Sequence, residues 1–239
     1  MESLLDQSSL LLQQLVNGIT LGGVYALIAV GYTMVYGVIQ LINFAHGEIY
    51  MLGGFLAYTL VAVLGMPFFP AFILTLLICA ILGVILDFVA YRPLRKAPRL
   101  AALITAIGMS IFLQNMAMLI WGSQIKSYPR DMLPPFFSES AITFGDVSLS
   151  WLQLFILAIT LSSMIILHLT IHKTRIGMAM RAISQDKTAS ALMGIGVNRV
   201  ISFTFAIGSA MGGMAGILVG LYYNAIFPTM GYVAGIKAF

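Results

Sequence analysis

Six long apolar stretches divide this chain into segments that can each cross a lipid bilayer. A membrane-spanning helix needs about 20 consecutive, mostly apolar residues, because the hydrocarbon core of a bilayer is about 30 Å thick. The stretches occupy residues 15–38, 47–65, 69–91, 101–121, 151–171 and 200–222, and a further apolar segment, 225–239, is interrupted by Pro228. The pattern predicts an all-α, polytopic membrane protein with six full spans and a broken C-terminal apolar segment, folded as one domain over residues 1–239.

Basic residues gather between these stretches in two places. Four lie within residues 92–99 and five lie within residues 172–199. Loops rich in Lys and Arg stay on the cytosolic side of a membrane, so both loops are predicted to be cytosolic, which the two spans between them allow. The loop 122–150 carries two basic and three acidic residues and is predicted to lie outside. Counting the spans back from it also places the N-terminus outside.

Composition excludes an ordinary soluble domain. The 239 residues are 60% hydrophobic and only 8% charged, with a mean hydropathy of +1.00, whereas soluble domains are about a quarter charged. The single cysteine, Cys79, lies inside an apolar stretch, so the sequence supports neither a disulfide nor a metal site. No His-Glu-x-x-His spacing, catalytic pairing or nucleic-acid-binding basic patch is present. Residues 1–9 contain no basic residue, so a cleaved signal peptide is not expected, and the first span is expected to double as the insertion signal.

Small residues recur every fourth position in the first and last spans, so each set shares one helix face. Such faces let two helix backbones approach closely in lipid, where apolar area alone gives no driving force for association. We expect these residues to mediate helix packing, either inside one subunit or against a partner subunit or a sliding gate helix. The residues are Gly18 and Gly22 in the first span and Gly208, Gly212, Gly216 and Gly220 in the last.

Several polar side chains stand at or inside the apolar stretches. Ionisable groups at membrane depth normally face a bundle interior or a water-filled cavity, and a helix break at Gly47 would let unwound backbone line such a path. The alternative is an interfacial turn in which a helix N-terminus holds Glu48. Asn115 and its neighbour Gln114 are explained equally well by hydrogen bonds inside the bundle. The candidate translocation-pathway residues are Asn17, Asn43, His46, Glu48 and Asn115.

Asp87 stands near the cytosolic end of the third stretch, followed by Arg92 and Arg95. We interpret this spacing as an ion pair at the membrane interface. A proton relay would need a second intramembrane acid, and none is evident.

The segment 172–199 is too polar to cross the bilayer and is predicted to form a cytosolic platform of short helices. Asp186 is suited to cap a helix N-terminus and Gly194 to end that helix, which gives a helix over residues 187–193. A helix of two turns must pack on something. We expect Leu192 and Met193 to face the bundle, with Lys187 or Ser190 facing the cytosol, and Asn198 to cap the last span.

This platform resembles the coupling loop of ABC-importer permeases, whose motif is Glu-Ala-Ala, three residues, then Gly. The aligned residues are Thr188, Ala189, Ser190 and Gly194, so the middle Ala and the Gly match while Thr and Ser replace the other two residues. On this resemblance the ATPase-coupling residues are Arg181, Asp186, Lys187, Thr188, Ala189, Ser190 and Gly194.

A broader resemblance covers nearly the whole chain. The segments 17–55, 174–182, 191–218 and 228–239 are similar to signatures of the branched-chain amino-acid ABC transporter permease of LivH type, a binding-protein-dependent permease. Members of that family continue with further spans, so the chain is expected to be truncated at its C-terminus.

The resemblance implies a multi-pass permease of the bacterial inner membrane that is not an enzyme. It pairs with a second, related permease subunit, two cytosolic ATP-binding subunits drive it, and an exterior binding protein delivers Leu, Ile or Val. The sequence has no G-x-x-x-x-G-K-[ST] phosphate loop, which agrees with ATP being used by a partner and no cofactor being bound by this chain. The alternatives are a permease for another amino acid, an amide or urea, and a passive channel without an ATPase.

Overall fold

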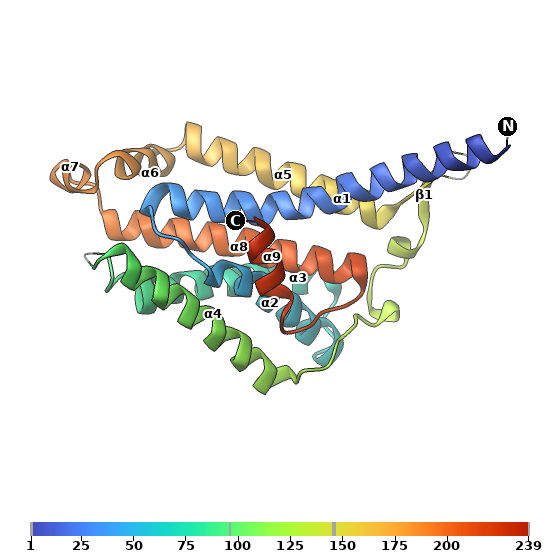
Figure 1. The fold of residues 1–239 in the computed structure, drawn as a ribbon, viewed down its shortest axis with the longest axis horizontal. Coiled ribbons are helices and arrows are strands. Elements are labelled where there is room, and N and C mark those ends of the chain that lie inside the picture. The colour runs from blue at the N-terminus through green and yellow to red at the C-terminus, as the bar shows by residue number, and fades with distance from the viewer. Residues whose placement is uncertain (1, 96, 145–146, 239) are drawn as a thin grey trace.

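The protein is a bundle of long helices that lie roughly along one axis, with short helices packed inside it or projecting from one end (Figure 1). The computed structural model describes residues 2–95, 97–144 and 147–238. Lys96 and Asp146, which contribute to the loop charges above, lie outside the described residues. The helices are α1 (Glu2–Ile39), α2 (Ala45–Tyr58), α3 (Phe68–Leu86), α4 (Arg99–Trp121), α5 (Trp151–Lys173), α6 (Arg175–Gln185), α7 (Lys187–Leu192), α8 (Val197–Tyr223) and α9 (Met230–Ala238).

Short elements complete the chain. The helices α2 and α3 run on into the π-helical turns η1 (Thr59–Val63) and η2 (Asp87–Tyr91). The segment after α4 contains two 3₁₀ turns, η3 (Arg130–Met132) and η4 (Pro135–Ser138), and an antiparallel hairpin of β1 (Ser140–Phe144) with β2 (Val147–Ser150).

Five helical segments are long and apolar enough to cross a membrane, which confirms the helical membrane-protein class: Ser9–Ile39, Phe68–Tyr91, Leu100–Trp121, Trp151–Lys173 and Val197–Tyr223. The expected second stretch, 47–65, forms α2 and η1 and is not among the five. Almost all residues of α2 are buried inside the bundle, so few of its side chains can contact lipid. The count of six spans stays a prediction.

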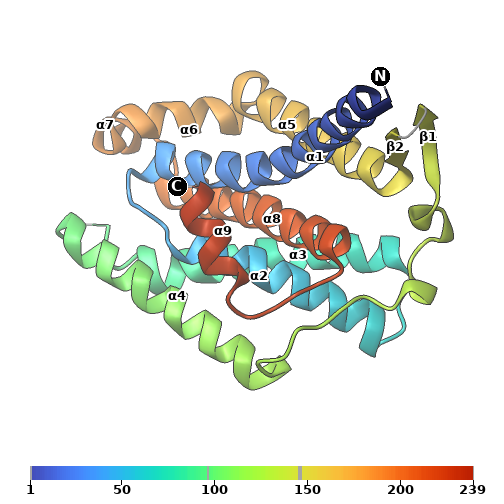
Figure 2. The ribbon, with the colours of Figure 1, turned by 45° about the vertical axis from the view of Figure 1, so that its right-hand side comes forward.

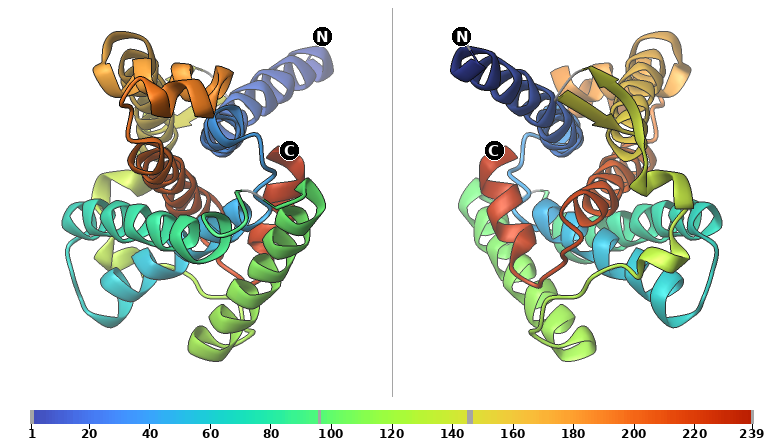
Figure 3. Two further views of the ribbon diagram at one scale, coloured as in Figure 1. Left: turned by 90° about the vertical axis from the view of Figure 1, so that its left-hand side faces the viewer. Right: turned by 90° about the vertical axis from the view of Figure 1, so that its right-hand side faces the viewer.

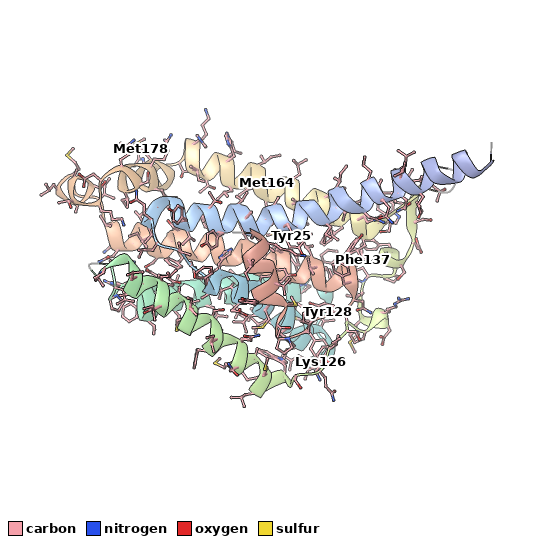
Figure 4. All side chains as sticks on the ribbon, in the orientation of Figure 1. Tyr25, Lys126, Tyr128, Phe137, Met164 and Met178 are labelled. Atoms are coloured by element: carbon pink, nitrogen blue, oxygen red, sulfur yellow. The ribbon has the colours of Figure 1, made fainter. Side chains whose placement is uncertain are left out.

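The two ends of the bundle differ as the charge pattern predicts. One end holds the end of α1, the segment between α3 and α4, and the pair α6–α7, so both basic loops share it (Figure 1). The N-terminus and the β1–β2 hairpin lie at the opposite end. Figure 4 labels Met178, on α6, at the first end and Lys126 and Tyr128 toward the second.

The helix α8 is the centre of the bundle, and α1, α2 and α3 pack around it (Figure 3). Its glycines make these approaches possible, because a Cβ at each would meet a neighbour at or inside contact distance. Gly208 lies against Val35 and Gly31 of α1, Gly212 against His46, Gly216 against the Tyr50 carbonyl of α2, and Gly220 against Tyr128. In contrast, a Cβ on Gly18 or Gly22 would meet nothing within 4 Å in the described part of the chain.

The segment after α4 is tied to the bundle at the end near the hairpin. The Tyr128 hydroxyl donates a hydrogen bond to the Gly54 carbonyl over 3.0 Å, and the Tyr128 backbone N–H donates to the side chain of Asn224. Lys126 and Ile226 exchange two backbone hydrogen bonds of 2.8 Å. This segment therefore fixes the turn between α8 and α9 against α2.

Candidate functional site

The chain turns back into the middle of the bundle after α1. Gln40 adopts a φ of +61°, a conformation that a helix does not continue through, and residues 40–44 lead to α2 in the interior (Figure 1). The predicted break at Gly47 was wrong, because the break precedes that residue and Gly47 lies in the first turn of α2.

The helices α8 and α9 form a second unit that follows the same course as α1 and α2, starting from the other end of the bundle. The helix α8 runs in the opposite direction to α1 (Figure 1), and it ends before Asn224, whose φ is +47°. Residues 225–229 then lead back to the short helix α9. Each unit is therefore a long helix, a residue with positive φ, a short loop and a short helix that starts inside the bundle.

The two units touch each other reciprocally at glycines. A Cβ on Gly31 would lie 3.0 Å from the Gly208 carbonyl oxygen, and a Cβ on Gly208 would lie 3.0 Å from the Gly31 carbonyl oxygen. Gly47 and Gly231 show the same reciprocity, with a Cβ on Gly231 lying 2.6 Å from the Gly47 carbonyl oxygen. These contacts describe an inverted repeat, an architecture that places half-helices near the middle of the membrane.

Glu48 is fully buried at this crossing. Its Oε1 accepts a hydrogen bond of 2.8 Å from the Ser110 hydroxyl on α4, and its Oε2 has no hydrogen-bond partner among the described residues. The carboxylate lies in the first turn of α2 and beside Gly231 in the first turn of α9. The positive ends of two helix dipoles therefore favour an anion there. The helix N-terminus expected as the alternative is present, but the site is buried and not interfacial.

His46 fills the junction of α1, α2 and α8. Its side chain is 1% exposed and its ring packs edge-on against Tyr32, with the ring centroids 5.9 Å apart. Gly31 and Gly212 leave the room that the ring occupies. The ring faces the Ile28 backbone without reaching hydrogen-bond geometry, and neither ring nitrogen has a partner in the described part of the chain.

Asn43 connects the loop before α2 to the end of η2, the turn that follows α3. The Tyr91 hydroxyl donates a hydrogen bond of 2.7 Å to Asn43 Oδ1, and both side chains are buried. The loop 40–44 is therefore held at its interior end by a polar contact that apolar neighbours shield from water.

Asp87 anchors the basic end of the bundle. It is fully buried, forms a salt bridge with Arg95, and accepts a hydrogen bond of 2.7 Å from the Ser202 hydroxyl on α8. The predicted ion pair is confirmed for Arg95. The Arg92 guanidinium instead lies over the Phe88 ring, 5.3 Å from its centroid.

A cavity of about 610 Å³ lies between α4 and α9, beside the Glu48 crossing. Figure 2 shows α9 packed across the inner helices with α4 alongside it. Ser110 is eleven residues from either end of α4 (Arg99 and Trp121), so the cavity is at mid-depth of that span. Its walls are mostly apolar: Phe44, Ile107, Ser110, Ile111, Gln114, Thr229, Tyr232, Val233, Gly235 and Ile236.

Three of the five expected pathway residues, Asn43, His46 and Glu48, are buried near the start of α2, but each contacts different neighbours and none is part of the lining of the 610 Å³ cavity. Asn17 lies toward the hairpin end, where it accepts a hydrogen bond of 2.8 Å from Gln153 on α5. Asn115 is exposed and donates to the Ile111 carbonyl of its own helix.

Ser110 was missed by sequence reasoning. A lone serine in an apolar span most often bonds its own helix, as Ser163 does with the Ile159 carbonyl. Nothing local in the sequence distinguishes Ser110, whose partner lies 62 positions away.

The platform helices form as expected. Asp186 Oδ1 accepts from the backbone N–H groups of Thr188 and Ala189 over 2.7 and 2.9 Å, which caps α7, and Gly194 ends the helical turn with a φ of +84°. Lys187 donates a hydrogen bond of 2.6 Å to the Ile39 carbonyl, so α7 is fastened to the end of α1. Arg181 lies on α6, beside a small cavity that α6 forms with α1.

Two expectations about the platform were wrong. Leu192 and Met193 are 84% and 83% exposed, whereas Ser190 is buried, so the apolar tip points away from the bundle. Asn198 does not cap α8, since Gly196 takes that position and the Asn198 side chain bonds Arg95. Lys187 bonds the Ile39 carbonyl and Asn198 bonds Arg95, and periodicity alone does not reveal such partners.

Comparison with known protein families identifies the family of this chain. The family model described as the branched-chain amino acid transport system permease component matches residues 14–239. The chain belongs to this family. Its members are transport permease subunits and not enzymes.

Named relatives agree with the family match. The chain is 46% identical over 236 residues to the high-affinity branched-chain amino acid transport system permease protein BraD of Pseudomonas aeruginosa, covering 95% of this chain and 76% of the relative. It is 42% identical over 247 residues to the permease protein LivH of Escherichia coli K12, covering 98% and 78%. No solved structure matches the chain significantly.

Proposed function

We propose that this chain is the membrane-spanning permease subunit of an ATP-driven importer that translocates leucine, isoleucine and valine. The observation that carries the proposal is the match of residues 14–239 to the permease component of branched-chain amino acid transport systems. The inverted repeat supports it, because opposed half-helices that meet inside the membrane are a recurrent architecture of transporters.

The proposed assembly contains a second related permease subunit, two cytosolic ATP-binding subunits and an exterior binding protein, in a bacterial inner membrane. The end that holds α6, α7 and residues 92–98 is cytosolic, because it carries the basic loops. The N-terminus and residues 122–150 are then exterior, and 122–150 is the surface nearest to a delivering binding protein.

The segment 172–199 is the coupling element in this proposal. Two of its contacts can transmit movement to the bundle. Lys187 bonds the end of α1, and Asn198 at the start of α8 bonds Arg95, which pairs with Asp87. The apolar tip of Leu192 and Met193 is the most exposed apolar part of this segment, ahead of Ile176 and Met178 on α6, which suits insertion into an apolar groove of an ATP-binding subunit. Movement of the platform would then rock α1 and α8 as packed units.

Reconstitution with the ATP-binding subunits and the binding protein tests the proposal. Labelled leucine is expected to accumulate only with ATP, with valine and isoleucine competing and urea not competing. Substituting Leu192→Ser together with Met193→Ser is expected to weaken association of the ATP-binding subunits by roughly thirtyfold, since apolar anchors at an interface contribute about 2 kcal/mol.

The matched control is Met132→Ser, an exposed methionine at the opposite end, which is expected to leave that association unchanged. Uptake of leucine without ATP, or uptake of urea in its place, would contradict the proposed function. Unchanged ATPase association in the double variant would contradict the coupling role alone.

A further inference from the structure

The cavity between α4 and α9 has the composition of a site for a small amphipathic solute. Ligand sites are typically 300–1,000 Å³, mostly apolar, with a few convergent polar groups, and this cavity has a volume of about 610 Å³. Ile107, Ile111, Val233 and Ile236 supply an aliphatic surface. Few polar groups line the walls, and one of them, Ser110, is hydrogen-bonded to the buried side chain of Glu48.

Ser110 is oriented by that charge. Its hydroxyl proton points to Glu48 Oε1 across 2.8 Å, so the lone pairs of its oxygen remain available for a further donor. A hydroxyl that donates to a carboxylate is polarised and becomes a better acceptor, particularly in surroundings of low dielectric. The wall of the cavity therefore presents an acceptor that favours a cation.

Glu48 lacks the partners that a purely structural carboxylate normally has. Its side chain is fully buried, its Oε2 accepts no hydrogen bond, and no basic side chain of the described residues forms a salt bridge with it. Buried carboxylates are ordinarily paired or fully hydrogen-bonded, because an unpaired one is costly. Glu48 Oε2 lies beside Gly231 inside the protein, and Glu48 does not line the cavity, so Ser110 is the member of the pair that reaches the cavity wall.

We propose that Ser110 is the acceptor for the substrate's α-ammonium group, and that Glu48 acts through Ser110 as a positioning residue. The aliphatic walls then take the branched side chain. The assignment rests on the proposed function and adds the recognition element for the charged end of the amino acid. The pairing is direct: an ammonium N–H donates to Ser110 Oγ, whose own proton is held on Glu48.

A reporter cysteine at Gln114, which lines the cavity one turn beyond Ser110, tests this in the assembled transporter. Alkylation of the Gln114→Cys variant by N-ethylmaleimide is expected to be slowed by leucine and by leucinol, both of which carry an ammonium group. It should not be slowed by 4-methylpentanoate, which has the same aliphatic chain without the ammonium. The native Cys79 is buried, and wild-type labelling supplies the background.

Adding Ser110→Ala or Glu48→Gln to the reporter is expected to raise the leucine concentration for half-protection by on the order of tenfold, equivalent to about 1.4 kcal/mol. Protection by leucine and by 4-methylpentanoate should then become equal. A Phe112→Cys reporter, exposed on the same helix outside the cavity lining, is expected to show no protection by any of the three compounds.

The outcomes separate the two proposals. If the wild-type transporter does not take up leucine, the proposed function fails. If it does, but Gln114→Cys is unprotected or is protected equally by 4-methylpentanoate, the ammonium site is wrong. That comparison uses a variant with Ser110 and Glu48 intact, so it stands even if Glu48→Gln fails to assemble.

Discussion

The helices α1 and α8 both carry glycines at every fourth position, but within the described residues the glycines of α8 are packed against other segments and Gly18 and Gly22 of α1 are not. The apolar stretches of the two helices have equal mean hydropathy. In α8, 78% of the residues of that stretch are buried, and in α1 only 44% are. Gly216 of α8 leaves no room for a Cβ beside the Tyr50 carbonyl oxygen, whereas Gly22 of α1 has open space around it. Spacing of four residues therefore establishes that small residues share a face, and it does not establish what covers that face.

The difference arises from which helices reach each position. The inner half of α1 is covered because α8 crosses it at Gly31 and α2 starts beside it, while the outer half projects beyond these contacts (Figures 1 and 2). On α8, three helices converge on successive glycines. Packing in lipid depends on such close approaches because apolar area alone favours no particular partner.

The largest effect is expected from Gly216→Ala. The new Cβ would overlap the Tyr50 carbonyl oxygen of α2, and α2 cannot retreat because Gly47 on its first turn already touches α9. Overpacking of cores costs about 1–3 kcal/mol, and a clash with the backbone of α2, which cannot move aside as a side chain could, should reach at least the upper end. Thermal unfolding of the purified subunit in detergent is the measurement, and an unfolding temperature equal to that of wild type would contradict the close contact.

Asp87→Asn is expected to have the next largest effect, at the basic end of α8. Removing the charge leaves Arg95 without its partner in a site where Asp87 is fully buried, and breaking a buried ion pair from one side costs about 3–5 kcal/mol. The low end is appropriate because the Arg95 side chain is 13% exposed. Denaturant unfolding of the subunit measures the loss.

Ser202→Ala is the matched control for that ion pair. It removes a hydrogen bond to the same carboxylate and keeps the salt bridge, so the expected loss is about 1.5 kcal/mol. Equal losses in the two variants would show that the charge of Asp87 does not contribute separately.

Sequence reasoning succeeded where one residue decides a local outcome. Asp186 caps α7 because its side chain reaches two free N–H groups within the next three positions, and Gly194 takes a conformation that other residues adopt poorly. Asp87 forms its salt bridge with Arg95, which is only eight positions further along the chain. Each of these contacts lies within a few turns, so spacing and residue type predict it.

Sequence reasoning failed where the partner is distant along the chain. Glu48 is recognisable as unusual, but Ser110 is recognisable only once α4 is placed beside α2. The orientation of α7 was reversed because Lys187 bonds the Ile39 carbonyl, 148 positions away, while Leu192 and Met193 are left exposed. Periodicity ranks side chains by polarity, and here specific hydrogen bonds outweighed that ranking.

The smallest effect is expected from Gly22→Ala, which tests the exposed member of the comparison. A Cβ at Gly22 meets no atom of the described residues within 4 Å, and alanine lowers the free energy of a helix by up to about 1 kcal/mol relative to glycine. The isolated subunit is therefore expected to unfold at the same temperature as wild type or slightly higher, in the assay used for Gly216→Ala. The same variant should still assemble with the other transporter subunits. If assembly is lost while the subunit's own stability is unchanged, a helix of another chain covers this face, and the two glycine patterns serve the same purpose in different interfaces.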